Sequence, residues 1–171
     1  MRALTLAAAL LTLAIAAPGF SQTLPPVARA VSLSGPRVGA TFLSQGVVDK
    51  LSERNIYTGS VISQFGWQIE KQFFSTSSDI TAVTELVGLL GGLEESLAIP
   101  SLTWLVGVRT RHGTEFGVGP NVTPAGAALA IAGGVTFRYG VLNVPINVAY
   151  VPAKAGPRVT ILSGFSLRGR R

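Results

Sequence analysis

Apolar and polar side chains alternate along most of this chain, and this alternation limits the possible fold more than any other feature of the sequence. Within residues 141–151, Asn143 and Asn147 lie on one face. The opposite face holds Leu142, Val144, Ile146, Val148 and Tyr150. Successive side chains point to opposite faces in a β-strand, whereas one face of a helix recurs about every 3.6 residues. The chain is therefore predicted to be all-β.

The same alternation recurs often enough to build a closed sheet. Eight strands are predicted, over residues 36–43, 61–73, 79–90, 101–110, 114–122, 127–139, 141–151 and 158–168. Short turns and longer loops alternate between them, which is typical of an antiparallel up-and-down β-barrel with an even number of strands. Eight strands enclose an interior that their own side chains just fill. In the first long connection, the run VVDKLSER predicts a short amphipathic helix.

Two prolines conflict with a regular ladder. Pro145 falls within the predicted strand at 141–151, and Pro100 directly precedes the one at 101–110. A closed barrel has no free edge where a residue without an N–H is harmless. A bulge or an earlier strand end is therefore expected near each of them.

The first segment of the chain predicts export. Residues 1–22 begin with Arg2, continue as an uncharged run from Ala3 to Ala17 and then reach Pro18 and Gly19, as in a secretory signal peptide. The alternative is a membrane anchor, but the run of 15 residues is shorter than the span needed, about 20 residues. The predicted organisation is a signal peptide at 1–22, an N-terminal extension at 23–35 and a barrel domain at 36–171.

A second uncharged stretch, of 22 residues, lies between Glu115 and Arg138. It contains five glycines and two prolines, Pro120 and Pro124. These residues are typical of a turn between two segments rather than of a helix interior. We therefore interpret it as two strands and a turn, not as a transmembrane helix.

Composition excludes several classes of protein. The chain has no cysteine, which excludes a disulfide scaffold, a thiolate zinc site and a cysteine nucleophile. Hydrophobic residues make up 47% of the sequence and charged residues 13%, so the chain is not expected to be disordered.

The composition of the polar face indicates which face is inside. A surface in contact with water usually has about a quarter to a third of its residues charged, whereas the polar face here is mostly Gly, Ala, Ser, Thr, Asn and Gln. We therefore expect the polar face to line the lumen and the apolar face to meet lipid, as in an outer-membrane barrel. The sparse charges, of both signs, are expected to form a structural network in the lumen: Arg37, Glu70, Glu85, Arg109, Glu115, Arg138 and Arg168. The lipid-facing residues are expected to include Phe65, Trp67, Trp104, Phe116, Phe137, Leu142, Val144, Ile146, Val148, Tyr150 and Phe165.

The alternative is a soluble periplasmic or secreted barrel of the lipocalin type, which binds an apolar ligand inside. It predicts that four large side chains are buried and face one another: Trp67, Trp104, Phe137 and Ile146.

Over about residues 36–168, this architecture resembles the small outer-membrane β-barrel proteins of Gram-negative bacteria. The stretches FGWQIEKQF, EFGVGPN and GGVTFRYGVLNVPINVAYVP also resemble a group of uncharacterised exported bacterial proteins. The resemblance implies membrane lipid and, during insertion, the barrel-assembly machinery as partners. Barrels of this kind usually end on an aromatic residue that this machinery reads, whereas here Phe165 is followed by SLRGRR. The resemblance implies no catalytic or ligand-binding residues.

Candidate chemical sites are few. His112 is the only histidine, so no second imidazole can share a metal, and we predict neither a metal site nor a cofactor. A lipid-modifying barrel enzyme would need a serine such as Ser78 or Ser101, His112 and a carboxylate at one rim. The three glutamates of the polar face could serve as general acids or bases, but structural pairing with arginines is favoured.

Nucleic-acid binding is not expected, because it needs an exposed basic patch interleaved with aromatic residues. The sequence thus predicts a non-enzymatic outer-membrane barrel with a plugged polar lumen, and a structural role or binding through the loops at 45–60, 91–96, 123–126 and 152–157.

Overall fold

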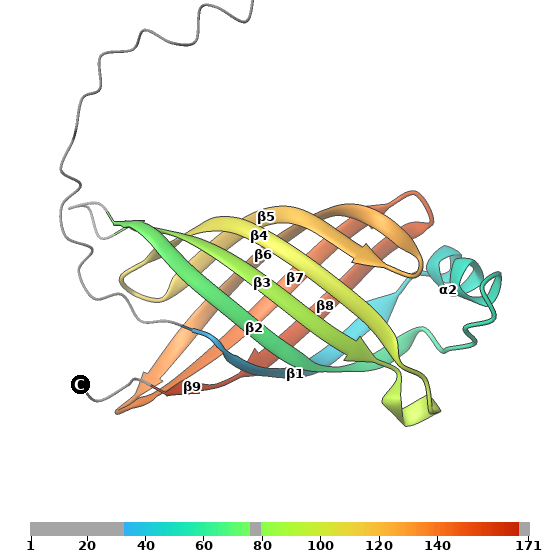
Figure 1. Cartoon of the computed structure of the whole chain (residues 1–171), viewed down its shortest axis with the longest axis horizontal. Coiled ribbons are helices and arrows are strands. Elements are labelled where there is room, and N and C mark those ends of the chain that lie inside the picture. The colour runs from blue at the N-terminus through green and yellow to red at the C-terminus, as the bar shows by residue number, and fades with distance from the viewer. Residues whose placement is uncertain (1–32, 76–79, 168–171) are drawn as a thin grey trace, which may run out of the picture.

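The computed structural model describes residues 33–75 and 80–167. They form a closed antiparallel barrel in which each strand pairs with its neighbours in sequence and β1 pairs with β8 (Figure 1). The strands are β1 (Gly35–Leu43), β2 (Val61–Ser75), β3 (Ile80–Gly91), β4 (Ile99–Thr110), β5 (Thr114–Thr123), β6 (Gly126–Tyr139), β7 (Leu142–Ala153) and β8 (Gly156–Gly164). The predicted all-β class and all eight predicted strands are confirmed. The predicted signal peptide at 1–22, most of the 23–35 extension, Ser78 and Arg168 lie outside the described residues.

The barrel has two different ends. The terminal end carries the start of β1, the two-residue strand β9 (Ser166–Leu167) and the connections β2–β3, β4–β5 and β6–β7. The helix end carries α2 (Gln45–Ser52), which lies beyond the strands at the opposite end of the barrel in Figure 1, and the 3₁₀ turn η1 (Leu93–Glu95). The predicted short helix is thus present, two residues earlier than the run VVDKLSER. No helix within the described ranges is long and apolar enough to cross a membrane.

Pro100 and Pro145 both lie inside observed strands, in β4 and β7. Pro145 pairs with Thr136 of β6, while the ladder from β7 to β8 ends at Ile146 and resumes only at Asn143 with β9. Pro100 likewise pairs with β3, while the ladder from β4 to β5 begins only at Leu102. Each proline therefore lies where one neighbouring ladder is absent, so its missing N–H breaks no bond. The expected shorter strands are wrong at both positions.

The outer face of the barrel is apolar. Trp67 and Trp104 are each 55% exposed, and Phe137 and Ile146 also point outward. Among the positions that alternate onto the outer face of β1–β8 in the described chain, Lys71 carries the only charge. The residues predicted for the apolar face all lie on this outer face: Phe65, Trp67, Trp104, Phe116, Phe137, Leu142, Val144, Ile146, Val148, Tyr150 and Phe165.

The inner face is less uniformly polar than expected. Two groups of apolar side chains fill the middle of the lumen: Leu105, Ala130, Ala132 and Val151, and Val87, Leu89 and Leu162. At the helix end, Val47 and Leu51 of α2 pack with Leu43, Ile62 and Ile99. A narrow barrel needs such packing, because polar groups buried without a hydrogen bond are costly.

One inward-facing glycine permits a close approach of two strands. A Cβ on Gly119 of β5 would lie 1.8 Å from the carbonyl oxygen of Trp104 on β4. At this point the ladder between these strands is interrupted, between the pairs Thr103–Asn121 and Val106–Val118. No side chain larger than hydrogen fits here unless a strand moves.

We expect Gly119→Ala to lower the free energy of unfolding by about 2 kcal/mol, because a strand must shift to admit the methyl group. Urea unfolding of the refolded barrel, followed by tryptophan fluorescence, measures this loss. Gly88→Ala is the matched control, since a Cβ there meets only Leu102, at 4.0 Å. Equal losses in the two variants would contradict the close approach.

Candidate functional site

A buried ionic cluster occupies the lumen toward the terminal end. The Arg109 guanidinium donates to both carboxylate oxygens of Glu70 at 2.7 and 2.6 Å. It also donates to Glu115, from Nε at 2.8 Å and from Nη2 at 2.5 Å. The nearest Glu85 oxygen lies 3.3 Å from Nη2. All four side chains are buried, so one cation serves three carboxylates.

The strand register explains why these groups meet. Glu70 on β2 lies directly opposite Glu85 on β3, and Arg109 on β4 lies opposite Glu115 on β5. Like charges that face each other across strands are destabilising. The guanidinium of Arg109 offsets this repulsion, because its planar fork can bind two carboxylates at once.

Arg37 lies at the edge of this cluster. Its guanidinium donates to Gln68 Oε1 at 3.0 Å and to the backbone oxygens of Leu33 and Pro36 at 2.5 and 2.9 Å. These acceptors are neutral, so Arg37 adds a positive charge without a direct ion pair among the described residues. Asn147 on β7 donates to Glu115 and connects the cluster to the far wall.

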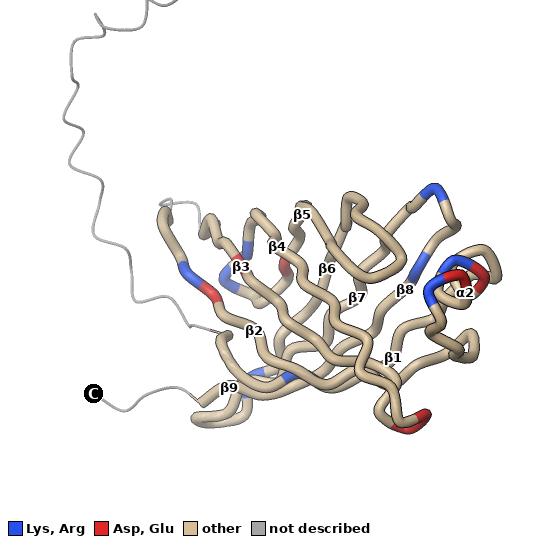
Figure 2. The backbone as a smooth tube through the Cα atoms, turned by 45° about the vertical axis from the view of Figure 1, so that its right-hand side comes forward, with Lys and Arg blue, Asp and Glu red and all other residues tan. Residues whose placement is uncertain are grey.

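The structure brings together most of the predicted charge network. Arg37, Glu70, Glu85, Arg109 and Glu115 face the lumen and are buried. Arg138 does not join them, because it is exposed at the rim, where it donates to the backbone oxygen of Arg111 at 3.0 Å. Arg168 lies outside the described residues. Figure 2 shows charged residues on α2 and near the strand ends, with long uncharged stretches of strand between them.

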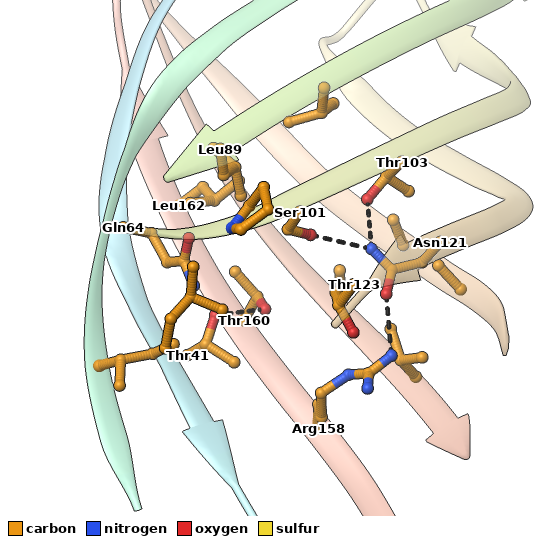
Figure 3. Close-up of a pocket in the computed structure, with 18 of the residues that line it drawn as sticks. Thr41, Gln64, Leu89, Ser101, Thr103, Asn121, Thr123, Arg158, Thr160 and Leu162 are labelled. Atoms are coloured by element: carbon orange, nitrogen blue, oxygen red, sulfur yellow. Dashed lines mark hydrogen bonds between the residues drawn. The ribbon is translucent and has the colours of Figure 1, made fainter. Parts of the chain in front are cut away.

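A second polar region lies in the lumen toward the helix end. It surrounds a cavity of about 80 Å³ whose polar walls include Thr41, Gln64, Ser101, Asn121 and Arg158 (Figure 3). Val47 and Leu51 of α2 line the same cavity on its apolar side. The helix therefore closes this end of the lumen over a partly polar space.

Arg158 of β8 is the residue of this region that the sequence did not reveal. Its side chain points into the cavity and is only 5% exposed. Nη2 donates to Asn121 Oδ1 at 2.9 Å, whereas Nη1 has no hydrogen-bond partner in the described part of the chain. Arg158 lies on the polar face together with Thr160. It was the first residue of the predicted strand at 158–168, whereas β8 begins two residues earlier, at Gly156.

Asn121 organises the polar wall beside Arg158. Its amide nitrogen donates to Ser101 Oγ at 3.0 Å and to Thr103 Oγ1 at 2.8 Å, while its oxygen accepts from Arg158. Both ends of the amide are thus used, which fixes the orientation of the Arg158 guanidinium. Across the cavity, the hydroxyls of Thr41 and Thr160 lie 2.8 Å apart.

Of the residues in the enzyme hypothesis, Ser101 and His112 do not meet, and Ser78 lies outside the described residues. Ser101 lies in the lumen near the helix end of β4, and His112 is exposed in the turn after β4, at the terminal end. The strand from Ser101 to Thr110 extends over about 30 Å before the turn that holds His112. Within the described ranges, no group of three or more His, Asp or Glu side chains is arranged to hold a metal ion.

At the helix end, η1 is tied to the first residues of β2. Glu94 accepts hydrogen bonds from the Ser63 hydroxyl and from the Ser63 backbone N–H, the latter at 2.7 Å. These bonds favour the ionised carboxylate and lower the pKa of Glu94. The loop between β3 and β4 is therefore held against the barrel rim.

No family model, curated protein or solved structure matches this chain.

We expect Arg109→Met to lower the free energy of unfolding by about 3–5 kcal/mol, because it leaves three carboxylates buried without their cation. The free energy is measured by urea unfolding of the refolded barrel. Arg138→Gln is the matched control, since that guanidinium is exposed and bonds only to a backbone oxygen among the described residues.

Replacing Arg109 together with two of its glutamate partners shows whether the cluster stabilises the barrel through charge balance or through packing. The triple variant Arg109→Met, Glu70→Gln, Glu115→Gln is expected to recover much of the stability lost in Arg109→Met, because replacing a whole buried ion cluster is often nearly neutral. A triple variant less stable than Arg109→Met alone would show that the cluster acts through packing rather than through charge.

Proposed function

We propose that this chain is an integral outer-membrane β-barrel protein of a Gram-negative bacterium. Its outer face lies in lipid and its filled lumen does not conduct solutes. Its role is structural, or is binding through the loops of the helix end. The composition of the outer face carries this proposal, because Lys71 is the only charge among the outward positions of the described strands.

The distribution of aromatic side chains supports a membrane-embedded band. Near the terminal end, the outer face carries Phe73, Phe74, Phe116, Phe137, Tyr139 and Phe165, all of them exposed. Aromatic girdles of this kind lie at the membrane interfaces of outer-membrane barrels. Each of the eight strands has at least nine residues, and a tilted strand needs about 9–11 to cross a bilayer.

The indole N–H of Trp104 on the outer face is paired within the protein. The Trp104 indole N–H donates to Thr84 Oγ1 at 2.7 Å, and that hydroxyl donates to the Leu105 backbone oxygen at 3.2 Å. Unpaired polar groups are costly in hydrocarbon, where no water replaces the lost hydrogen bond. The arrangement suits a surface that faces lipid.

The filled lumen argues against a diffusion channel. Val47 and Leu51 of α2 are buried at the helix end, and the Arg109 cluster occupies the lumen toward the terminal end. Eight-stranded barrels enclose little more than their own side chains. Contact with other molecules is then left to the outer face and to the loops.

A soluble barrel that binds an apolar ligand inside is the second candidate. It requires Trp67, Trp104, Phe137 and Ile146 to line the interior, whereas all four lie on the outer face. Their outward position favours the membrane proposal, since a water-exposed apolar surface of this extent would promote aggregation.

Cell fractionation tests the location directly. The full-length protein is expected in urea-washed outer membranes and is expected to migrate faster on a gel when it is not boiled, because the folded barrel stays compact. Recovery as a soluble periplasmic or secreted protein would contradict the proposal.

A charge on the outer face tests the lipid contact. Val106 is outward-facing in the interior of β4, and Val106→Arg is expected to lower the stability of the folded barrel in lipid vesicles by about 2–4 kcal/mol. The fraction folded at increasing urea concentration measures this loss. Tyr57→Arg, at an exposed residue of the loop between β1 and β2, is the control and should change little. No loss in Val106→Arg would indicate that this face meets water.

A further inference from the structure

The lumen near the helix end contains a buried cation that lacks a counter-ion. Arg158 is only 5% exposed, and one of its terminal nitrogens, Nη1, has no hydrogen-bond partner among residues 33–75 and 80–167. Within the described ranges, no carboxylate lies within 4 Å of its guanidinium. A buried charge without a partner is strongly unfavourable, so this arrangement indicates a site for an anion.

The carboxylates of the lumen are already engaged. Glu70, Glu85 and Glu115 all contact Arg109 in the cluster toward the terminal end. Glu85 also lines the far side of the cavity, but its oxygen is held 3.3 Å from Arg109 Nη2. Arg158 is instead held by the neutral Asn121, which leaves its positive charge uncompensated on the cavity wall.

The cavity beside Arg158 combines a polar wall with apolar walls. Its volume of about 80 Å³ exceeds the space of a single water and corresponds to roughly six non-hydrogen atoms. Its apolar lining comes from α2 and the strand ends beneath it (Leu43, Val47, Leu51, Ile62, Ile99 and Ala125) and from apolar side chains of the middle of the lumen, among them Leu105, Ala130, Ala132, Val151 and Leu162. A ligand that fits must therefore be small, singly charged and partly apolar.

We propose that this cavity binds a short-chain monocarboxylate of about three to five carbons. The carboxylate accepts from Arg158 Nη1, and the alkyl chain lies against Val47 and Leu51 of α2. A guanidinium with one free edge suits a carboxylate, which accepts through both of its oxygens. The site is internal, so the proposal does not depend on whether the outer face meets lipid or water.

The same walls disfavour a phosphate. Apart from Arg158, no cationic side chain of the described residues lines the cavity. A multiply charged anion would therefore be poorly neutralised there and would lose its hydration to an apolar surface.

Calorimetric titration of the refolded full-length barrel with sodium butyrate tests the proposal. Butyramide has the same shape without the charge and is expected to bind at least 10-fold more weakly, while sodium chloride at equal ionic strength should give no saturable heat. Arg158→Gln is expected to weaken butyrate binding at least 10-fold. Arg138→Gln, which removes an exposed rim cation, should bind as the unmodified protein does.

A variant that keeps Arg158 guards against a folding defect in Arg158→Gln. Ala132→Leu places extra volume in the cavity wall without altering charge, and it should also abolish butyrate binding while unboiled gel mobility shows a folded barrel. The proposal is overturned if folded unmodified barrel binds no carboxylate from acetate to hexanoate. Unchanged butyrate affinity in folded Arg158→Gln or Ala132→Leu would overturn it, as would tighter binding of phosphate than of butyrate.

Discussion

The interior of this barrel depends on the guanidinium of Arg109. Closing a sheet of eight strands leaves a narrow lumen, and the register of β2 and β3 places Glu70 directly opposite Glu85 inside it. Glu115 enters from β5, opposite Arg109 itself. Without the cation, three carboxylates would share a space from which water is largely excluded. The planar fork of Arg109 lets these strands keep a register that their charges alone would oppose.

The buried charges of the lumen balance in number but not in position. Arg37, Arg109 and Arg158 face Glu70, Glu85 and Glu115, and all six are buried. Two of the arginines lie with all three glutamates toward the terminal end, whereas Arg158 lies alone beneath α2. The cluster is therefore left with an excess of negative charge and the cavity with a positive one. Leu105, Ala130 and Ala132 form apolar walls of the cavity that is lined by Arg158 and, on its far side, by Glu85.

The features of the fold that depend on the alternation of neighbouring residues were predicted from the sequence, whereas those that depend on how the barrel closes were not. Because side chains alternate strictly in strands, the eight strands followed from the period. The outward position of Trp67 and Trp104 followed from the composition of the two faces. The apolar packing of the lumen was not predicted, since Leu162 and Val87 have the parity of the inner face but that face was expected to be polar. Parity put Arg138 on the inner face, but its distance from the strand end decides its exposure. Arg158 was missed because it was the first residue of the predicted strand, where parity does not distinguish a buried side chain from an exposed one. Its separation from the described carboxylates is a long-range property of the fold.

The outer face of the barrel is determined by what surrounds the protein and the inner face by the packing of the lumen. The membrane proposal and the ligand proposal can therefore be tested independently. In one strand, Val159 and Ile161 present apolar surface outward, while Arg158 and Thr160 present polar atoms inward. An outward substitution changes what surrounds the barrel but leaves the lumen packing in place. An inward substitution alters a charge or a cavity that the outer surface never contacts. The glycine at position 119 is an exception, because there the backbone of one strand approaches the next so closely that any side chain would disturb both faces at once.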